Sequence, residues 1–235
     1  MATSELTPRL HQTKRERITE REDAIVDAAR EAFLKGGLRG ARMAEIAQRA
    51  GVAEGTLYLY YKNKSDLMRA VVAQHWDDLT RGAHQAVERA GDRPVDQLEA
   101  LVRFHLDLLI SDWPLLELSF SLTYMEGDDP PSSYKRDYVV VLDQVLYRGR
   151  DKGVFSAKVD TRVLRDMVFG TLEYAARSAL LMVESKRREH QEHSIETLMI
   201  ALLAVLQKPK QSELPPDAME RLHHAIDRLE GLSSV

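Results

Sequence analysis

Apolar residues recur three and four positions apart along most of the chain, which is the spacing of one face of an α-helix. Between residues 21 and 35 this face is clear, and the double glycine Gly36-Gly37 follows it. Glycine accepts the left-handed backbone conformation that ends many helices. The pattern therefore predicts a helix over residues 21–35. Its apolar face consists of Ile25, Ala28, Ala29, Ala32 and Phe33.

Two shorter helices and one long helix are predicted next. Residues 42–50 place Met43 and Ile46 on one side, Gly51 makes a turn, and residues 54–60 form the third helix. Asn63 has the side chain of a helix N-cap, and Asp66 stands three residues later as in a capping box. The long helix that follows is predicted to run from Lys64 to about Ala90.

The remainder of the chain is again helical in pattern. Helices are predicted over residues 95–110, 114–126, 132–152, 160–185 and 189–207, because glycine and proline clusters separate these periodic stretches. Residues 208–216 have the composition of a linker, and residues 217–229 form a last amphipathic helix. No strand-like alternation is found, so the predicted fold class is all-α.

Composition narrows the functional classes. The chain has no cysteine, which excludes disulfides, thiolate zinc sites and cysteine nucleophiles. The N-terminus is polar and lacks the apolar core of a signal peptide, and no apolar run approaches the roughly 18 residues of a membrane span. We therefore expect a cytoplasmic protein that does not associate with a membrane.

Charge is distributed unevenly between the two parts of the chain. Residues 1–75 hold 13 basic and 10 acidic side chains, whereas residues 76–235 hold 20 and 27. A basic head on an acidic body is typical of a protein that binds DNA through its head alone. Residues 1–20, with Lys14, Arg15 and Arg17 clustered, are predicted to form a basic, flexible arm.

One segment carries the strongest functional signal. Residues 46–67, IAQRAGVAEGTLYLYYKNKSDL, predict two short helices joined by a glycine turn and followed by a third helix. A helix-turn-helix of this layout presents its second helix to the major groove of DNA. Gly55 allows close approach to a phosphate, the hydroxyls of Thr56, Tyr58 and Tyr60 reach polar groups on DNA, and Leu57 and Tyr61 face inward. The predicted DNA-binding residues are Arg42, Arg49, Glu54, Gly55, Thr56, Tyr58, Leu59, Tyr60 and Lys64.

Over residues 21–72 the chain resembles the TetR family of bacterial transcriptional regulators. The family typically shows an IA–AGV–GTLY–YF–K–L pattern, and these elements are present here at the right spacing. Residues 73–235 are similar only in length, helicity and order of elements. Three positions depart from the family. Arg42 and Ala53 stand where caps are common, and Leu59 stands where a polar residue such as histidine is common. Leu59 gives up a hydrogen bond to DNA but supplies an apolar contact for a thymine methyl.

The resemblance implies a domain organisation and an assembly. A three-helix DNA-binding domain at residues 21–72 precedes a larger helical ligand-binding and dimerisation domain at residues 73–207, and residues 208–235 form the linker and C-terminal helix. The family forms homodimers that bind palindromic operators, and its last two long helices pair with those of the partner. The implied interface residues are Leu164, Val168, Gly170, Leu172, Ala176, Leu198 and Leu202.

The resemblance also implies a small-molecule effector that binds among the middle helices and releases a repressor from DNA. The segments DKGVF and FGTLE are similar to members that sense acyl-CoA or other lipophilic compounds. Arg103 and Arg177 are the candidate anchors for a carboxylate or phosphate. The candidate lining residues are Arg103, Phe104, Leu108, Trp113, Phe120, Tyr124, Tyr147, Met167, Tyr174 and Arg177.

Two alternatives remain open from the sequence alone. His190, Glu192, His193 and Glu196 could bind a divalent metal, but the chain lacks an HExxH motif, a phosphate loop and a nucleophile elbow, so we expect no enzyme, catalytic residue, cofactor or metal. The other alternative is a DNA-binding regulator that a protein partner controls, or that has no small-molecule effector. A purely architectural DNA-binding protein should be strongly basic, and the sequence pI near 6.1 argues against one.

Overall fold

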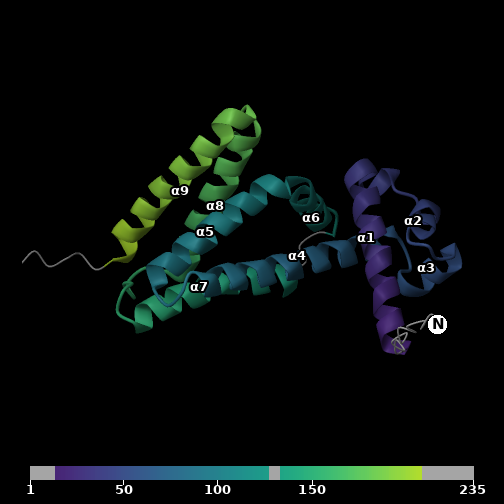
Figure 1. The fold of residues 1–235 in the computed structure, drawn as a ribbon, viewed down its shortest axis with the longest axis horizontal. Helices are drawn as coiled ribbons and strands as arrows, with labels where there is room; N and C mark the ends of the chain where they lie inside the picture. Colours follow the sequence, from purple (N-terminus) through teal and green to yellow (C-terminus); the bar gives the residue numbers. More distant parts are fainter. Residues whose placement is uncertain (1–13, 127–132, 208–235) are drawn as a thin grey trace, which may run out of the picture. The chain divides into compact units, whose positions relative to one another are not determined.

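The computed structural model describes residues 14–126 and 133–207, apart from the side chains of residues 14–17, 120–126 and 133–134. Within these ranges all regular structure is helical, which confirms the predicted all-α class (Figure 1). None of the described helices is both long enough and apolar enough to cross a lipid bilayer. The helices are α1 (Lys14–Gly40), α2 (Met43–Arg49), α3 (Glu54–Tyr60), α4 (Lys64–Arg89), α5 (Pro94–Ser111), α6 (Trp113–Glu126), α7 (Ser133–Asp151), α8 (Thr161–Leu180) and α9 (Glu184–Leu206).

Most boundaries lie within one or two residues of the predicted ones, and α1 is the main exception. It begins at Lys14, so residues 14–20 are helical and the prediction of a flexible arm is wrong for them. The regular part of α1 ends where predicted, because Gly37 adopts a left-handed φ of 61°. Residues 1–13, the linker at 208–216 and the C-terminal helix at 217–229 lie outside the described residues.

The turn between α8 and α9 was also misplaced by the sequence pattern. The structure ends α8 at Leu180 and begins α9 at Glu184, whereas the prediction continued the first helix to residue 185. This turn has no glycine or proline to mark it. Arg187 instead donates to the carbonyl oxygens of Ala179 (3.2 Å) and Met182 (3.3 Å), which satisfies acceptors that a helix end leaves open.

The described helices form two compact units. One unit comprises the residues up to Gln85 together with Asp107–Val141, and the other comprises Ala86–Leu106 together with the residues from Leu142 onward. Helices α4, α5 and α7 contribute to both. The domain boundary that the sequence places between residues 72 and 73 stays a prediction.

In the first unit, α1, α2 and α3 pack around one apolar core, and α6 also contacts α1 (Figure 1). Ile25, Phe33, Ile46 and Leu57 are all at most 1% exposed. The predicted inward orientation of Leu57 and Tyr61 is confirmed, since Tyr61 is also buried. Burial, and then the neighbouring Glu22 to which its hydroxyl donates, raises the pKa of Tyr61 to about 12.

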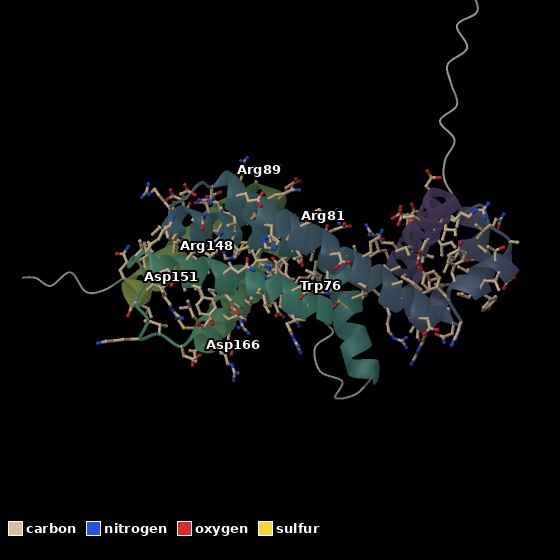
Figure 2. The ribbon with its side chains drawn as sticks, turned by 90° about the horizontal axis from the view of Figure 1, so that it is seen from below. Trp76, Arg81, Arg89, Arg148, Asp151 and Asp166 are labelled. Atoms are coloured by element: carbon tan, nitrogen blue, oxygen red, sulfur yellow. The ribbon has the colours of Figure 1, made fainter. Side chains whose placement is uncertain are left out.

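A buried polar contact ties α4 to α6 in the same unit. The indole Nε1 of Trp76 donates to the hydroxyl of Ser119 at 3.1 Å. The ring of Tyr138 on α7 meets the indole edge-on, with 5.5 Å between the ring centroids. By contrast, Arg81 and Arg89 on α4 point away from the helix pack (Figure 2). A buried indole needs such a hydrogen-bond partner, so Ser119 fixes which face of α6 meets α4.

The second unit is built around the antiparallel hairpin of α8 and α9. Asp160 caps α8 by accepting from the backbone amides of Arg162 (2.7 Å) and Val163 (3.1 Å). In α7, Gly149 lies against the ring of Phe155, and a Cβ at this glycine would fall 1.9 Å from the ring. Gly149 lies within the helix, as predicted, and provides the space into which Phe155 packs.

His105 is a titratable group inside this second unit. Its ring is 7% exposed and meets Phe169 edge-on with 4.8 Å between the centroids. Burial lowers the pKa of His105 to about 3, and burial likewise lowers the pKa of His75 in the first unit. Both imidazoles are therefore neutral in the folded protein near neutral pH.

We expect His105→Gln to reduce the loss of stability in acid. Unfolded histidine titrates near 6.5, so between about pH 6.5 and 3 the unfolded chain binds more protons and the free energy of unfolding falls as pH falls. Removing this group should shrink the difference in unfolding free energy between pH 7 and pH 5 by up to about 2 kcal/mol. Urea denaturation at both pH values measures it. Equal acid sensitivity of wild type and His105→Gln would contradict the assignment.

Candidate nucleic-acid interface

The two short helices of the head are held by packing and by their neighbours. Neither Arg42 before α2 nor Ala53 before α3 caps its helix with a side-chain hydrogen bond, as expected from the sequence. Gly51 makes the turn between them with a φ of 69°, and the amide of Val52 donates to Ala47 at 3.0 Å. This turn sets the angle at which α3 leaves α2.

The two sides of α3 differ sharply. Leu57 is fully buried, whereas Tyr58 is 46% and Leu59 is 85% exposed. Glu54 and Gly55 are exposed too, and Thr56 and Tyr60 are half-buried. Those of the predicted DNA-binding residues that belong to α3 therefore form its outer face and edges.

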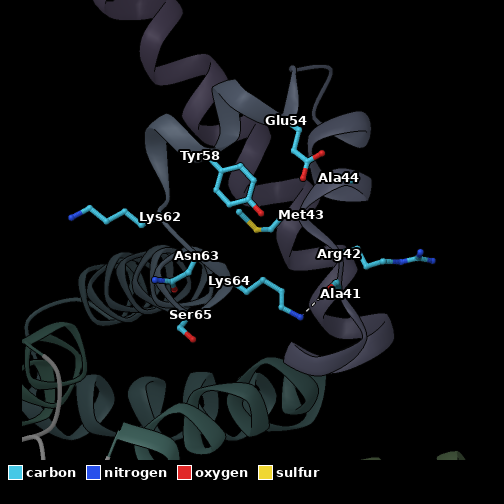
Figure 3. Close-up of a pocket in the computed structure, with 10 residues that line it drawn as sticks. All are labelled: Ala41, Arg42, Met43, Ala44, Glu54, Tyr58, Lys62, Asn63, Lys64 and Ser65. Atoms are coloured by element: carbon cyan, nitrogen blue, oxygen red, sulfur yellow. Dashed lines mark hydrogen bonds between the residues drawn. The ribbon is translucent and has the colours of Figure 1, made fainter.

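An open concavity of about 650 Å³ adjoins this face (Figure 3). It combines the end of the loop after α1, the start of α2, the outer face of α3 and the start of α4. Four of the predicted DNA-binding residues line it, namely Arg42, Glu54, Tyr58 and Lys64. The full lining is Ala41, Arg42, Met43, Ala44, Glu54, Tyr58, Lys62, Asn63, Lys64 and Ser65.

The cations around the concavity differ in how they are held. Arg42 points outward in Figure 3, with its side chain 77% exposed, and its guanidinium pairs with Glu45 at 2.8 Å. Lys64 points across the concavity and donates to the carbonyl oxygens of Ala41 (3.0 Å) and Arg39 (3.3 Å). The ammonium of Lys64 therefore also closes the end of α1, a structural role that the sequence did not indicate.

Arg49 has a partner inside the head. Its guanidinium forms an ion pair with Glu31 of α1, so it joins α2 to α1 at the surface. Its predicted DNA contact stays a prediction, and the structure gives it a positioning role.

Sequence reasoning missed Lys62, which lies in the motif four residues after Tyr58 and is exposed at the concavity. Lys62 lies in the short loop between α3 and α4, and the signal available was a lysine directly before the predicted N-cap Asn63.

Gly55 is unusual because nothing in the described part of the chain requires a glycine there. Its φ is not in the left-handed region, and a Cβ built on it meets no atom within 4 Å. A glycine inside a helix costs stability relative to alanine. A molecule that approaches α3 closely from outside would account for its presence.

Asn63 behaves as the sequence predicts. Its side-chain oxygen accepts from the backbone amide of Asp66 at 2.9 Å, which caps α4. The carboxylate of Asp66 accepts from Arg69 at 2.7 Å. The start of α4, with Lys62 and Lys64 beside it, is thus fixed against the concavity.

Comparison with known proteins decides the family. Residues 25–71 match the model for bacterial regulatory proteins of the tetR family, and residues 73–201 match the model for the C-terminal region of YsiA-like proteins. The chain belongs to the TetR family. It is a transcriptional regulator whose helix-turn-helix is formed by α2 and α3.

Similar TetR-family proteins include regulators of lipid metabolism. A fatty acid metabolism regulator protein of Bacillus subtilis is 28% identical over 63% of this chain and 78% of its own length. The solved fatty acid degradation regulator FadR of Bacillus halodurans is 26% identical, with a TM-score of 0.61 over 79% of this chain and 99% of that one. The structure of FadR from Bacillus subtilis in complex with stearoyl-CoA has a TM-score of 0.57 at 23% identity, over 77% of this chain and 95% of that one.

The predicted ligand-binding site of this regulator stays a prediction, and four of its residues lie on the surface of the protomer. Tyr147 (53%), Met167 (43%) and Tyr174 (76%) are exposed on the protomer, as is Arg177, which pairs with Glu173 at 2.8 Å. These four side chains therefore do not line an internal cavity of the protomer. For Met167 and Tyr174 the reason is that α8 has apolar residues on two faces, and the sequence pattern did not reveal which face is buried.

The other ligand candidates have varied surroundings. Leu108 is buried, and Phe104 and Trp113 are half-buried. Arg103 pairs with Glu192 at 2.6 Å and with Glu99 at 3.1 Å. The side chains of Phe120 and Tyr124 lie outside the described residues.

The predicted dimer residues need a correction of the same kind. Six of the seven are buried in the protomer itself, and the exception is Gly170. The six are buried because they form the contact of α8 and α9 with each other and with the other helices of the second unit. They are therefore already covered before any partner arrives. The six are Leu164, Val168, Leu172, Ala176, Leu198 and Leu202.

Gly55→Ala should separate folding from DNA binding. The added methyl meets no protein atom, so thermal stability should stay equal or rise by up to about 0.5 kcal/mol. Operator affinity should fall roughly tenfold, which corresponds to about 1.4 kcal/mol, because the methyl stands between α3 and the DNA backbone. Calorimetric melting and fluorescence anisotropy with an operator selected from random duplexes measure the two effects. Wild-type operator affinity in this variant would show that the glycine does not serve close approach.

Proposed function

We propose that the protein is a homodimeric repressor that binds a palindromic operator with one α3 helix in each half-site. The observation that carries this proposal is the exposed outer face of α3 beside the concavity, on the framework of a TetR-family head. Arg42, Lys62 and Lys64 surround the concavity and supply positive charge for phosphates. Two-fold operators require two reading helices about 34–36 Å apart, which one protomer cannot supply.

The proposed dimer surface is the outer stripe of α8 and α9, in place of the buried residues predicted from the sequence. On α8, Val163, Met167, Gly170 and Tyr174 follow the four- and three-residue spacing of one helix face and are all exposed. On α9, Ile200 is 71% exposed. A Cβ on Gly170 would meet no atom of the described residues within 4 Å, so this helical glycine leaves room for the close approach of another chain.

Tyr174→Glu should convert the dimer into a monomer, because a carboxylate would be buried without a partner in the bundle. Operator affinity should fall by at least about 100-fold, since the two half-sites are no longer bound by one linked molecule. Sedimentation velocity and anisotropy measure these effects. Tyr147→Glu is the matched control, because Tyr147 is an exposed tyrosine outside the stripe. A dimeric Tyr174→Glu protein with normal affinity would disprove this interface.

The proposed effector is a long-chain acyl-CoA. Three observations support this choice: the match of residues 73–201 to a YsiA-like C-terminal region, the similarity to fatty acid regulators, and the stearoyl-CoA found in a protein of the same fold. The acyl chain would take apolar surface and the phosphates would need cations. Arg103 is one candidate for that role, and a phosphate there would compete with Glu99 and Glu192.

Such an effector must bind more tightly to the state that does not bind DNA, because it shifts the equilibrium only by its differential affinity. Reciprocally, operator DNA must weaken effector binding by the same factor. Repression follows if the operator overlaps a promoter. An increase in transcription from an operator-bearing template would instead assign activation.

Stearoyl-CoA should lower operator affinity by about tenfold or more, within the usual range of allosteric coupling. Anisotropy titrations of the protein–operator complex measure this, with free CoA and stearate as controls for each half of the ligand. Calorimetric titration of stearoyl-CoA into the free protein and into the protein–operator complex must give the same coupling factor in the reverse direction. If acyl-CoA binds the protein and operator affinity does not change, the proposed control mechanism is wrong.

A further inference from the structure

The recognition helix has an uncommon composition for a DNA-reading surface. The seven residues of α3, EGTLYLY, include no lysine or arginine. The commonest specific contact with DNA, an arginine or lysine on the O6 and N7 of guanine, is therefore not available from this helix. Sequence must be read by other chemistry, or from other elements.

Leu59 is the most exposed side chain among the large hydrophobic residues of the head, with 85% of its surface open to solvent. It lies two residues after the fully buried Leu57, and two residues turn a helix by about 200°, so Leu59 points directly away from the core. A single exposed leucine needs no explanation on an ordinary surface. This one, however, stands on the outer face of the helix that a TetR-family head inserts into the major groove.

We propose that Leu59 reads the 5-methyl group of a thymine in each operator half-site, and so determines specificity at that base pair. The inference rests on the proposed operator binding and adds the chemistry of one contact. In the major groove the thymine methyl is the one apolar group that the base pairs present. Contact with it removes apolar surface of both partners from water, whereas a polar base edge at that place would lose its own hydration against the leucine.

The neighbours of Leu59 fit this division of roles. Glu54, the first residue of α3 and also exposed, would repel phosphates but can accept from the amino groups of bases. Arg42, Lys62 and Lys64 lie outside α3 and provide the cationic groups for the backbone. Leu59 therefore belongs to a reading surface without positive charge, and its loss should alter specificity and leave the electrostatic part of binding in place.

Thymine-to-uracil substitution tests the contact directly, because deoxyuridine keeps the pairing and the O4 acceptor and removes only the methyl. The operator is first selected from random duplexes with the full-length wild-type protein. Each thymine of the half-site is then replaced symmetrically by deoxyuridine. We expect one position at which wild-type affinity falls by about fourfold per half-site, the loss associated with one buried methyl group.

Leu59→Ala should bind the thymine and uracil operators equally at that position, with an unchanged salt dependence because Leu59 neutralises no phosphate. Its melting temperature should match wild type, since the side chain is exposed. Leu34→Ala, which shortens another exposed leucine of the head, should keep the fourfold preference.

The outcomes separate the two proposals. A selected operator that tolerates uracil at every thymine, or a Leu59→Ala protein that keeps the wild-type preference for thymine, would overturn the inference and leave operator binding intact. Selection of no preferred duplex at all would overturn the proposed function, and the inference with it.

Discussion

Helices of seven residues do not form on their own in water, because nucleation costs more than two turns of hydrogen bonds return. Both α2 and α3 have this length, and neither begins with a capping side chain. Their existence depends on the core beneath them, where Ile46 and Leu57 are excluded from water together with Ile25 and Phe33 of α1. The orientation of the reading face is thus a consequence of packing on the opposite face, and loss of the core would remove the helix and its orientation together.

Side chains from neighbouring elements supply the capping that the helices themselves lack. Lys64 donates to carbonyl oxygens at the end of α1, and Arg187 does the same at the end of α8. These contacts satisfy the open acceptors of a helix end and fix the next helix relative to the last. In the head, the same lysine stands beside the concavity, so one side chain joins the integrity of α1 to the surface that faces DNA.

The sequence predicted those parts of the molecule in which one residue type has one structural meaning. Gly37 and Gly51 adopt the left-handed conformations expected of them, and Asn63 caps α4 as its position suggested. The turn after α8 could not be predicted, because its stabilising residue, Arg187, is a charged side chain that looks like any other on a helix surface. For α1, a charged N-terminal stretch was read as an arm although the helix begins at Lys14.

The candidate sites differ in the same way, because the sequence predicted the buried face of α3 but not that of α8. On α3 a single residue, Leu57, is apolar, small enough to bury and correctly spaced, so the exposed face followed from it. On α8 two apolar stripes compete, one through Leu164 and Leu172 and the other through Met167 and Tyr174. Periodicity shows that both exist, but only the packed structure shows that the first is internal and the second is open to solvent. Pairwise contacts such as Arg49 with Glu31 lie beyond any periodicity argument, because the two residues are far apart in sequence.

The lack of basic residues on α3 has an evolutionary consequence. In many DNA-binding proteins one arginine both attracts the phosphate backbone and recognises a base. A mutation that changes the sequence preference of such a protein therefore also weakens its electrostatic affinity for DNA. In the proposed complex the groups that attract the duplex are Arg42, directly before α2, and Lys62 and Lys64 around the start of α4, whereas the groups that read bases are on α3. Substitutions on this one short helix can therefore change the operator specificity of descendants of this chain while their non-specific affinity for DNA is retained. New target genes can then be gained gradually.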